Sequence, residues 1–160
     1  PSDDQTNRHI QDDVLNVLKS DNWDMLMVAH PPCTRLCNSG VRWLHKAPPN
    51  KTLSQMWDEL EKGAKLFSSL LNADVPRVAV ENPVMHKHAK QRIENYQPFS
   101  QSIQPWQFAN DDDSDDNVKK RARDECHKVP PSKDRWKIRS KFYHGIARAM
   151  AIQWGDMNYI

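Results

Sequence analysis

The strongest constraint on the fold of this chain is a long amphipathic segment placed between two short apolar runs. Residues 53–71 carry apolar side chains at every third or fourth position, which is the spacing of one face of an α-helix. Residues 24–29 and 77–81 centre on short apolar runs with polar flanks, typical of strands buried on both faces. Strand, helix and strand in this order predict a βαβ unit with two parallel strands. We therefore expect an α/β protein.

Both expected strands end in polar segments that contain proline. Residues 30–33 read HPPC after the first strand, and residues 81–83 read ENP after the second. Proline stops a strand because it has no backbone N–H to donate to a neighbouring strand. Ligands of open parallel sheets bind beyond the carboxyl ends of the strands. Cys33 and Glu81 are therefore expected at the same edge of the sheet.

The rest of the chain gives weaker signals. Its length of 160 residues suits a single domain spanning residues 1–160. An acidic block runs into a basic one at residues 110–123, which predicts a charged loop or a disordered segment because almost nothing there can be buried. Further helices are expected at residues 9–18, 41–45, 85–93 and 139–154, and a third strand at residues 102–108.

Composition excludes several classes of protein. No apolar run approaches the roughly 18–20 residues that a membrane span needs, so no membrane partner is expected. Three cysteines are too few and too uneven for a disulfide framework, which favours a reducing, cytoplasmic compartment. The polar start shows no secretory leader, and a first residue of proline suggests processing or a missing N-terminal piece. The net charge of +2 neither requires nor excludes a nucleic-acid partner, and nothing predicts the oligomeric state.

Cys33 is the first candidate for chemistry. A thiolate is a strong nucleophile, and a strand end framed by prolines holds its side chain rigidly. The competing interpretation is a small residue that fills a turn. Glu81 follows a buried-strand pattern, so its carboxylate lies at the sheet edge or is paired, and it could hold or donate a proton. For Glu81 the alternative is an ordinary surface glutamate at the start of a loop.

Metal and phosphate binding are also open. Cys33, Cys37 and His30, with Cys126 and His127, could supply zinc ligands, but their spacing is looser than that of zinc motifs and no metal is expected. Basic residues near an aromatic residue could contact a nucleic-acid backbone, or could simply be a solvated surface. The candidates for nucleic-acid contact are Arg35, Arg42, Lys119, Arg121 and Arg123.

Four segments together resemble a known family. They are AHPPCTRLCNSGVRWL (29–44), RVAVENPVMHKHA (77–89), QPWQF (104–108) and PPSKDRW (130–136). The pairing of Pro-Cys with Glu-Asn is similar to the nucleophile loop and carboxylate motif of DNA cytosine-5 methyltransferases, and the whole set resembles their short phage and prophage relatives. The resemblance implies a Rossmann-like methyltransferase fold, DNA as partner and S-adenosylmethionine as cofactor. For a phage-encoded protein the compartment would be the bacterial host cytoplasm.

The resemblance also implies roles for single residues. Cys33 would attack carbon 6 of a flipped-out cytosine, and Glu81 would act on the ring nitrogen. Asp13, Pro31 and Pro32 would contact the cofactor. The family's glycine-containing first motif and its ribose-binding acid have no counterpart in this sequence. Two alternatives therefore stay open: a non-catalytic nucleic-acid-binding or decoy module on the same core, and a zinc-stabilised interaction domain.

Overall fold

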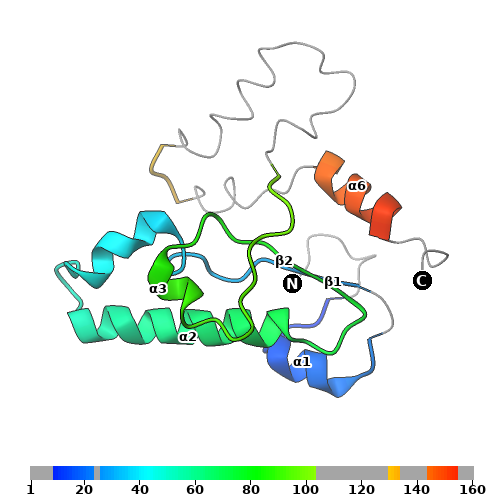
Figure 1. Cartoon of the computed structure of the whole chain (residues 1–160), viewed down its shortest axis with the longest axis horizontal. Helices are drawn as coiled ribbons and strands as arrows, with labels where there is room; N and C mark the ends of the chain where they lie inside the picture. The colour runs from blue at the N-terminus through cyan, green and yellow to red at the C-terminus, as the bar shows by residue number, and fades with distance from the viewer. Residues whose placement is uncertain (1–8, 24–25, 104–129, 134–143, 155–160) are drawn as a thin grey trace, which may run out of the picture. The chain divides into compact units, whose positions relative to one another are not determined.

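A computed structural model of the chain describes residues 9–23, 26–103, 130–133 and 144–154 (Figure 1). The chain divides into two compact units, Pro1–Gln97 and Pro98–Ile160. That residues 1–160 form one domain stays a prediction. The charged segment 110–123 and most of the expected third strand lie outside the described residues, and residues 102 and 103 are not in a strand.

The first unit contains the expected strand, helix and strand. Its elements are α1 (Val14–Ser20), β1 (Leu26–Ala29), the 3-10 helix η1 (Asn38–Leu44), α2 (Leu53–Leu71), β2 (Arg77–Val80) and α3 (Lys87–Lys90). The bounds of α2 agree with the prediction. Helix α1 begins later than expected, because the Asp13 carboxylate accepts a hydrogen bond from the Leu15 N–H (2.9 Å) and caps the helix there. Helix α3 is shorter than expected, since His86 caps its start.

Strands β1 and β2 form a two-stranded parallel sheet, which confirms the predicted pairing. The register places Leu26 opposite Arg77 and Ala29 opposite Val80. The ladder continues one step further, where the Glu81 N–H donates to the Ala29 carbonyl oxygen (2.9 Å). The carboxyl ends of both strands therefore lie side by side. A Rossmann-like arrangement around this pair stays a prediction.

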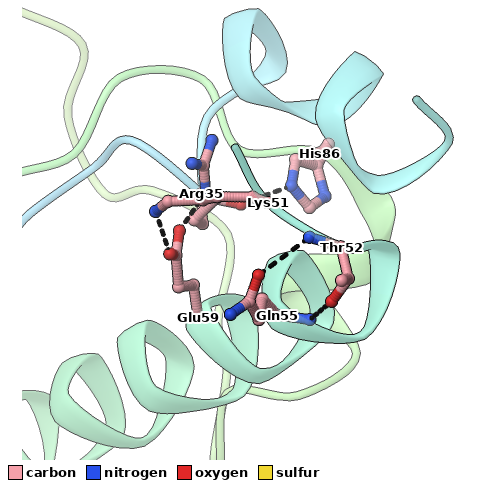
Figure 2. Close-up of polar contacts among 6 residues, drawn as sticks. All are labelled: Arg35, Lys51, Thr52, Gln55, Glu59 and His86. Carbon is pink, nitrogen blue, oxygen red and sulfur yellow. Dashed lines mark hydrogen bonds and ion pairs between the residues drawn. The ribbon is translucent and has the colours of Figure 1, made fainter. Parts of the chain in front are cut away.

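The core of the first unit is built on one face of α2. The buried residues Met56, Leu60, Ala64 and Phe67 recur at four, four and three positions along the helix. Leu36 and Leu44 from the segment after β1, and Met85, Ala89 and Ile93 from the segment after β2, complete this cluster. Both post-strand segments are thus packed on the same helix. A capping box fixes the start of α2: the Thr52 hydroxyl accepts from the Gln55 N–H, and the Gln55 side chain accepts from the Thr52 N–H (Figure 2).

The second unit contains one described helix, α6 (His144–Trp154), which falls inside the helix expected at residues 139–154. Phe99 is exposed to 76% of its surface. Within the described ranges of both units, we find no helix that combines the length and apolar character needed to cross a membrane.

Candidate functional site

Four polar side chains gather where β1 and β2 end, and we call them the strand-end site: His30, Cys33, Glu81 and Asn82. His30 Nδ1 lies 3.6 Å from Glu81 Oε2, directly beyond the last paired residues of the two strands. The Glu81 carboxylate is close enough to Cys33 to raise the pKa of its thiol. The structure therefore brings the two predicted catalytic residues to the same edge.

One tight turn holds Cys33 in place. Its carbonyl oxygen accepts from the N–H groups of Leu36 (2.9 Å) and Cys37 (3.0 Å). Leu36 is fully buried in the core, so the turn is anchored at its end. Gly40 then passes so close to the turn that an added Cβ would lie 2.0 Å from the Thr34 carbonyl oxygen. Only glycine allows this approach, which makes the position of the turn specific.

The segments that follow the two strands are also joined to each other. The Asn38 N–H donates to the Val84 carbonyl oxygen (2.9 Å), and the His86 N–H donates to that of Leu36 (3.1 Å). Cys37 and Met85 form an antiparallel bridge at this point. The Pro-Pro-Cys and Glu-Asn-Pro segments thus hold each other in register beyond the sheet.

A buried histidine and an ion-pair network hold Arg35, which lies in the turn that begins at Cys33 (Figure 2). His86 Nε2 lies 2.7 Å from the Arg35 carbonyl oxygen, while its Nδ1 accepts from the Ala89 N–H (3.1 Å). Those two bonds require the neutral ring with the proton on Nε2. The Arg35 Nε donates to Glu59 Oε2 on α2 (2.7 Å), and Lys51 pairs with the other oxygen of Glu59. Arg35 therefore ties the cysteine turn to α2.

The electrostatics of the site favour a protonated thiol in the free protein. Burial is the largest cause of the raised Cys33 pKa, followed by the neighbouring Cys37 and, as a smaller contribution, the Glu81 carboxylate. Burial and negative neighbours both disfavour a thiolate. In the free protein Cys33 is therefore held as a thiol, with the Glu81 side chain nearby.

Asn82 is the least satisfied polar group of the site. Its amide nitrogen and oxygen are both buried, and neither has a hydrogen-bond partner among the described residues. An unpartnered buried amide costs about 1–3 kcal/mol. Such a cost at the end of a strand that already carries Glu81 indicates that this position is kept for something other than the stability of the free protein.

The three residues expected to contact S-adenosylmethionine lie at the start of α1 (Asp13) and in the segment after β1 (Pro31 and Pro32). The Asp13 carboxylate oxygen Oδ1 is used as the cap of α1. Pro31 is buried, and Pro32 is exposed beside it. That these three residues contact S-adenosylmethionine stays a prediction, and no chemical step below depends on the cofactor.

The residues expected to contact nucleic acid are distributed differently. Arg35 is half-buried and engaged with Glu59. Arg42 is exposed, with its guanidinium 4.4 Å from the ring centroid of Trp43. Lys119, Arg121 and Arg123 lie outside the described residues, as do the zinc candidates Cys126 and His127. In the described part of the chain, no three His, Cys, Asp or Glu side chains converge as metal ligands.

Sequence reasoning gave no role at the strand ends to three residues: His30 beside Glu81, Cys37 beside Cys33, and the orphaned Asn82. His30 had one available signal, since the matched register of two parallel strands places the residues after their ends side by side. Burial of the Asn82 amide depends on packing, which no local pattern encodes. Comparison with models of protein families, with curated proteins and with solved structures finds no match to this chain.

Proposed function

We propose that the strand-end site is the cytosine-attacking site of a protein similar to DNA cytosine-5 methyltransferases, with Cys33 as nucleophile and Glu81 as its proton partner. The observation that carries the proposal is a half-buried thiol and a carboxylate beyond the carboxyl ends of two adjacent parallel strands, near enough for Glu81 to raise the pKa of Cys33. The methyl donor that the resemblance implies, S-adenosylmethionine, supplies the methyl group in that family and enters none of the steps below.

The proposed chemistry begins with proton transfer from Cys33 to Glu81. As a cytosine enters, the thiol proton passes to Glu81, which removes the negative charge that opposed the thiolate. Cys33 Sγ then forms a bond to carbon 6, the carbon 5–carbon 6 π pair becomes a carbon 4–carbon 5 double bond, and the carbon 4–nitrogen 3 π pair moves to nitrogen 3, which takes the proton from Glu81. The product is a neutral enamine whose carbon 5 is nucleophilic. Reversal returns the proton to Glu81 and releases the thiol.

Hydrogen exchange at carbon 5 tests these steps without a methyl donor. Water can protonate carbon 5 of the enamine, and loss of the original hydrogen before reversal exchanges it. DNA with tritium at carbon 5 of cytosine should therefore release tritium into water with the full chain. We expect Cys33→Ala to abolish release and Glu81→Gln to lower it by about 100-fold or more.

The neighbouring thiol provides the matched control. Cys37→Ser removes a buried sulfur that contacts the Ser39 hydroxyl (3.1 Å) and raises the pKa of Cys33, so it should retain exchange or increase it. Release that persists at the wild-type rate in Cys33→Ala would exclude Cys33 as the nucleophile. Transfer of label from S-adenosylmethionine to DNA, measured in the same variants, then asks whether methylation follows the attack.

A second candidate function is a non-catalytic nucleic-acid-binding module on the same core. It is favoured by the raised pKa of Cys33, which disfavours the thiolate in the free protein. This function predicts DNA affinity that falls steeply with salt, and no heat on titration with S-adenosylmethionine. Heat of cofactor binding together with tritium release would reject it.

A further inference from the structure

A second cluster of charge lies in the first unit, away from the groups of the strand-end site. Residues 87–92 read KHAKQR, so four of six positions are basic. The His88 ring is at its centre, with its centroid 5.8 Å from that of His86, 6.1 Å from His45 and 5.3 Å from Trp57. These neighbours come from α3, from the end of η1 and from α2. We call the group the His88 surface: His45, Trp57, Lys87, His88, Lys90 and Arg92.

The basic side chains of this cluster repel one another. The pKa of His88 is lowered, first by desolvation and then by its basic neighbours Lys87, His86, Arg92 and His45. Like charges at neighbouring positions destabilise a helix. Arg92 is paired with Glu61, whereas Lys87 and Lys90 are exposed. Folding therefore does not explain why so many cations gather here, and an anionic partner would.

Planar groups are interleaved with these cations. The Arg92 guanidinium lies 5.0 Å from the ring centroid of Trp57, and the His88 ring meets the same tryptophan edge-on. The Lys90 ammonium lies 5.9 Å from the Tyr96 ring centroid. Cations held against aromatic rings are oriented before a partner arrives, so less side-chain freedom is lost on binding. Cationic and aromatic side chains in alternation suit a polymer that offers both phosphates and flat bases.

We propose that the His88 surface binds the sugar-phosphate backbone of nucleic acid, as a positioning contact separate from the strand-end site. The inference rests on the proposed function in one respect, because it takes DNA as the polymer that reaches Cys33. Lys87 and Lys90 supply exposed charges to phosphates. Arg92, His88 and Trp57 supply planar side chains on the same surface.

Paired lysine substitutions test the proposal in the full chain. Binding of a fluorescent DNA duplex is measured by anisotropy over a range of salt. Lys87→Gln with Lys90→Gln should weaken binding by about 10- to 100-fold near 0.1 M salt and reduce the slope of log affinity against log salt by about 2. The control is Lys19→Gln with Lys62→Gln, two exposed lysines on α1 and α2, which removes the same charge and should leave affinity and slope within error.

Two further measurements keep the result decisive. Lys87→Arg with Lys90→Arg retains the charge and should retain binding, which separates charge loss from misfolding. Poly-glutamate at equal charge should compete poorly, since it lacks bases and a phosphate geometry. Equal affinity in the two glutamine pairs, or displacement by poly-glutamate as effective as by DNA, would overturn the proposal.

The two proposals fail in different ways. Suppose that tritium release requires Cys33, and that substitution of Lys87 and Lys90 changes neither the release nor the affinity for DNA. The proposal for the His88 surface is then rejected, and the proposal for the strand-end site stands. If salt-dependent DNA binding requires both lysines but no tritium is released from cytosine, the proposal for the strand-end site is rejected and the proposal for the His88 surface stands. A chain that neither binds DNA nor releases tritium contradicts both.

Discussion

At the scale of single residues, the reactivity that we propose for the strand-end site depends on whether Cys33 or Glu81 holds a proton. Cys33 and Glu81 were predictable as neighbours because both follow strands with matched apolar patterns and both strands end at prolines. The protonated state of the thiol was not predictable, since it depends on burial and on Cys37 in the same turn. Arg35 shows the same limit: its sequence position suggested phosphate contact, but its Nε bonds Glu59, which lies 24 residues further along the chain.

Alkylation should report the proton held by Cys33. Because its pKa is raised, the thiol should react slowly with iodoacetamide at neutral pH and faster as pH rises. Glu81→Gln removes a negative neighbour, so the midpoint of the rate–pH profile should move to lower pH. Peptide mass spectrometry can follow Cys33 separately from Cys37. Glu94→Gln, an exposed carboxylate in the segment after α3, serves as a control, and an equal shift in that variant would contradict a local effect of Glu81.

Glu59 should make stability depend on acid. Bonds from Lys51 and then Arg35 lower the pKa of its carboxyl. A lowered native pKa stabilises the fold above the unfolded pKa of about 4.5, and this contribution disappears as pH falls through the native pKa. Glu59→Gln should therefore lower the free energy of unfolding by up to about 1 kcal/mol at pH 7, with the difference vanishing in acid.

Urea unfolding at several pH values measures that difference. Asp58→Asn removes a carboxylate from the next position of α2, where the side chain is exposed, and is the matched control. A Glu59→Gln difference that stays constant from neutral to acidic pH would show that the ion pairs do not stabilise the fold.

At the scale of elements, α2 is the part of the fold that the sequence predicted best. Its apolar spacing is set by local geometry, and the same side chains became the core. The 3-10 helix η1 was expected only as a short helical piece around residues 41–45. Its longer extent depends on the close approach of Gly40 to Thr34, a tertiary contact that has no periodic signature.

The two glycines next to this packing should respond in opposite directions to alanine. Gly40→Ala places a Cβ 2.0 Å from the Thr34 carbonyl oxygen, so it should destabilise the fold by about 1–3 kcal/mol. Gly63 lies within α2, and a Cβ there would meet Leu36 Cδ2 at 3.5 Å, an ordinary contact. Gly63→Ala should therefore stabilise by about 0.5–1 kcal/mol, through better helix propensity. Thermal unfolding of both variants measures the contrast, and shifts of the same sign would contradict it.

At the scale of the whole molecule, the buried cluster found among the described residues lies between Leu36 and Ile93. The predicted pair of parallel strands is present in the first unit, whereas the α/β class and a larger sheet stay predictions. The sequence could not supply the division into two units, because the composition changes more abruptly at residue 110 than at residue 97.

The first unit should fold by itself. A chain of residues 1–97 keeps the core cluster, both strands and the ion pairs of α2, so it should melt cooperatively with helical circular dichroism. Leu60→Ala in that chain should cost about 2–5 kcal/mol, because Leu60 is fully buried, and should abolish or sharply lower the transition. A shortened chain with no cooperative transition would show that residues 98–160 are needed for folding.

The orphaned Asn82 amide links folding to recognition. A ligand that hydrogen-bonds both Asn82 amide atoms would remove part of the free-energy cost of leaving them unpartnered. Because such a ligand would bind the folded chain and not the unfolded chain, it would stabilise the fold. The melting temperature is then a detector of occupancy that requires no assumption about the reaction. A panel of nucleosides and short oligonucleotides could be ranked by the shift in melting temperature. Asn82→Leu has no buried amide to hydrogen-bond, so its melting temperature should not respond to the same ligands.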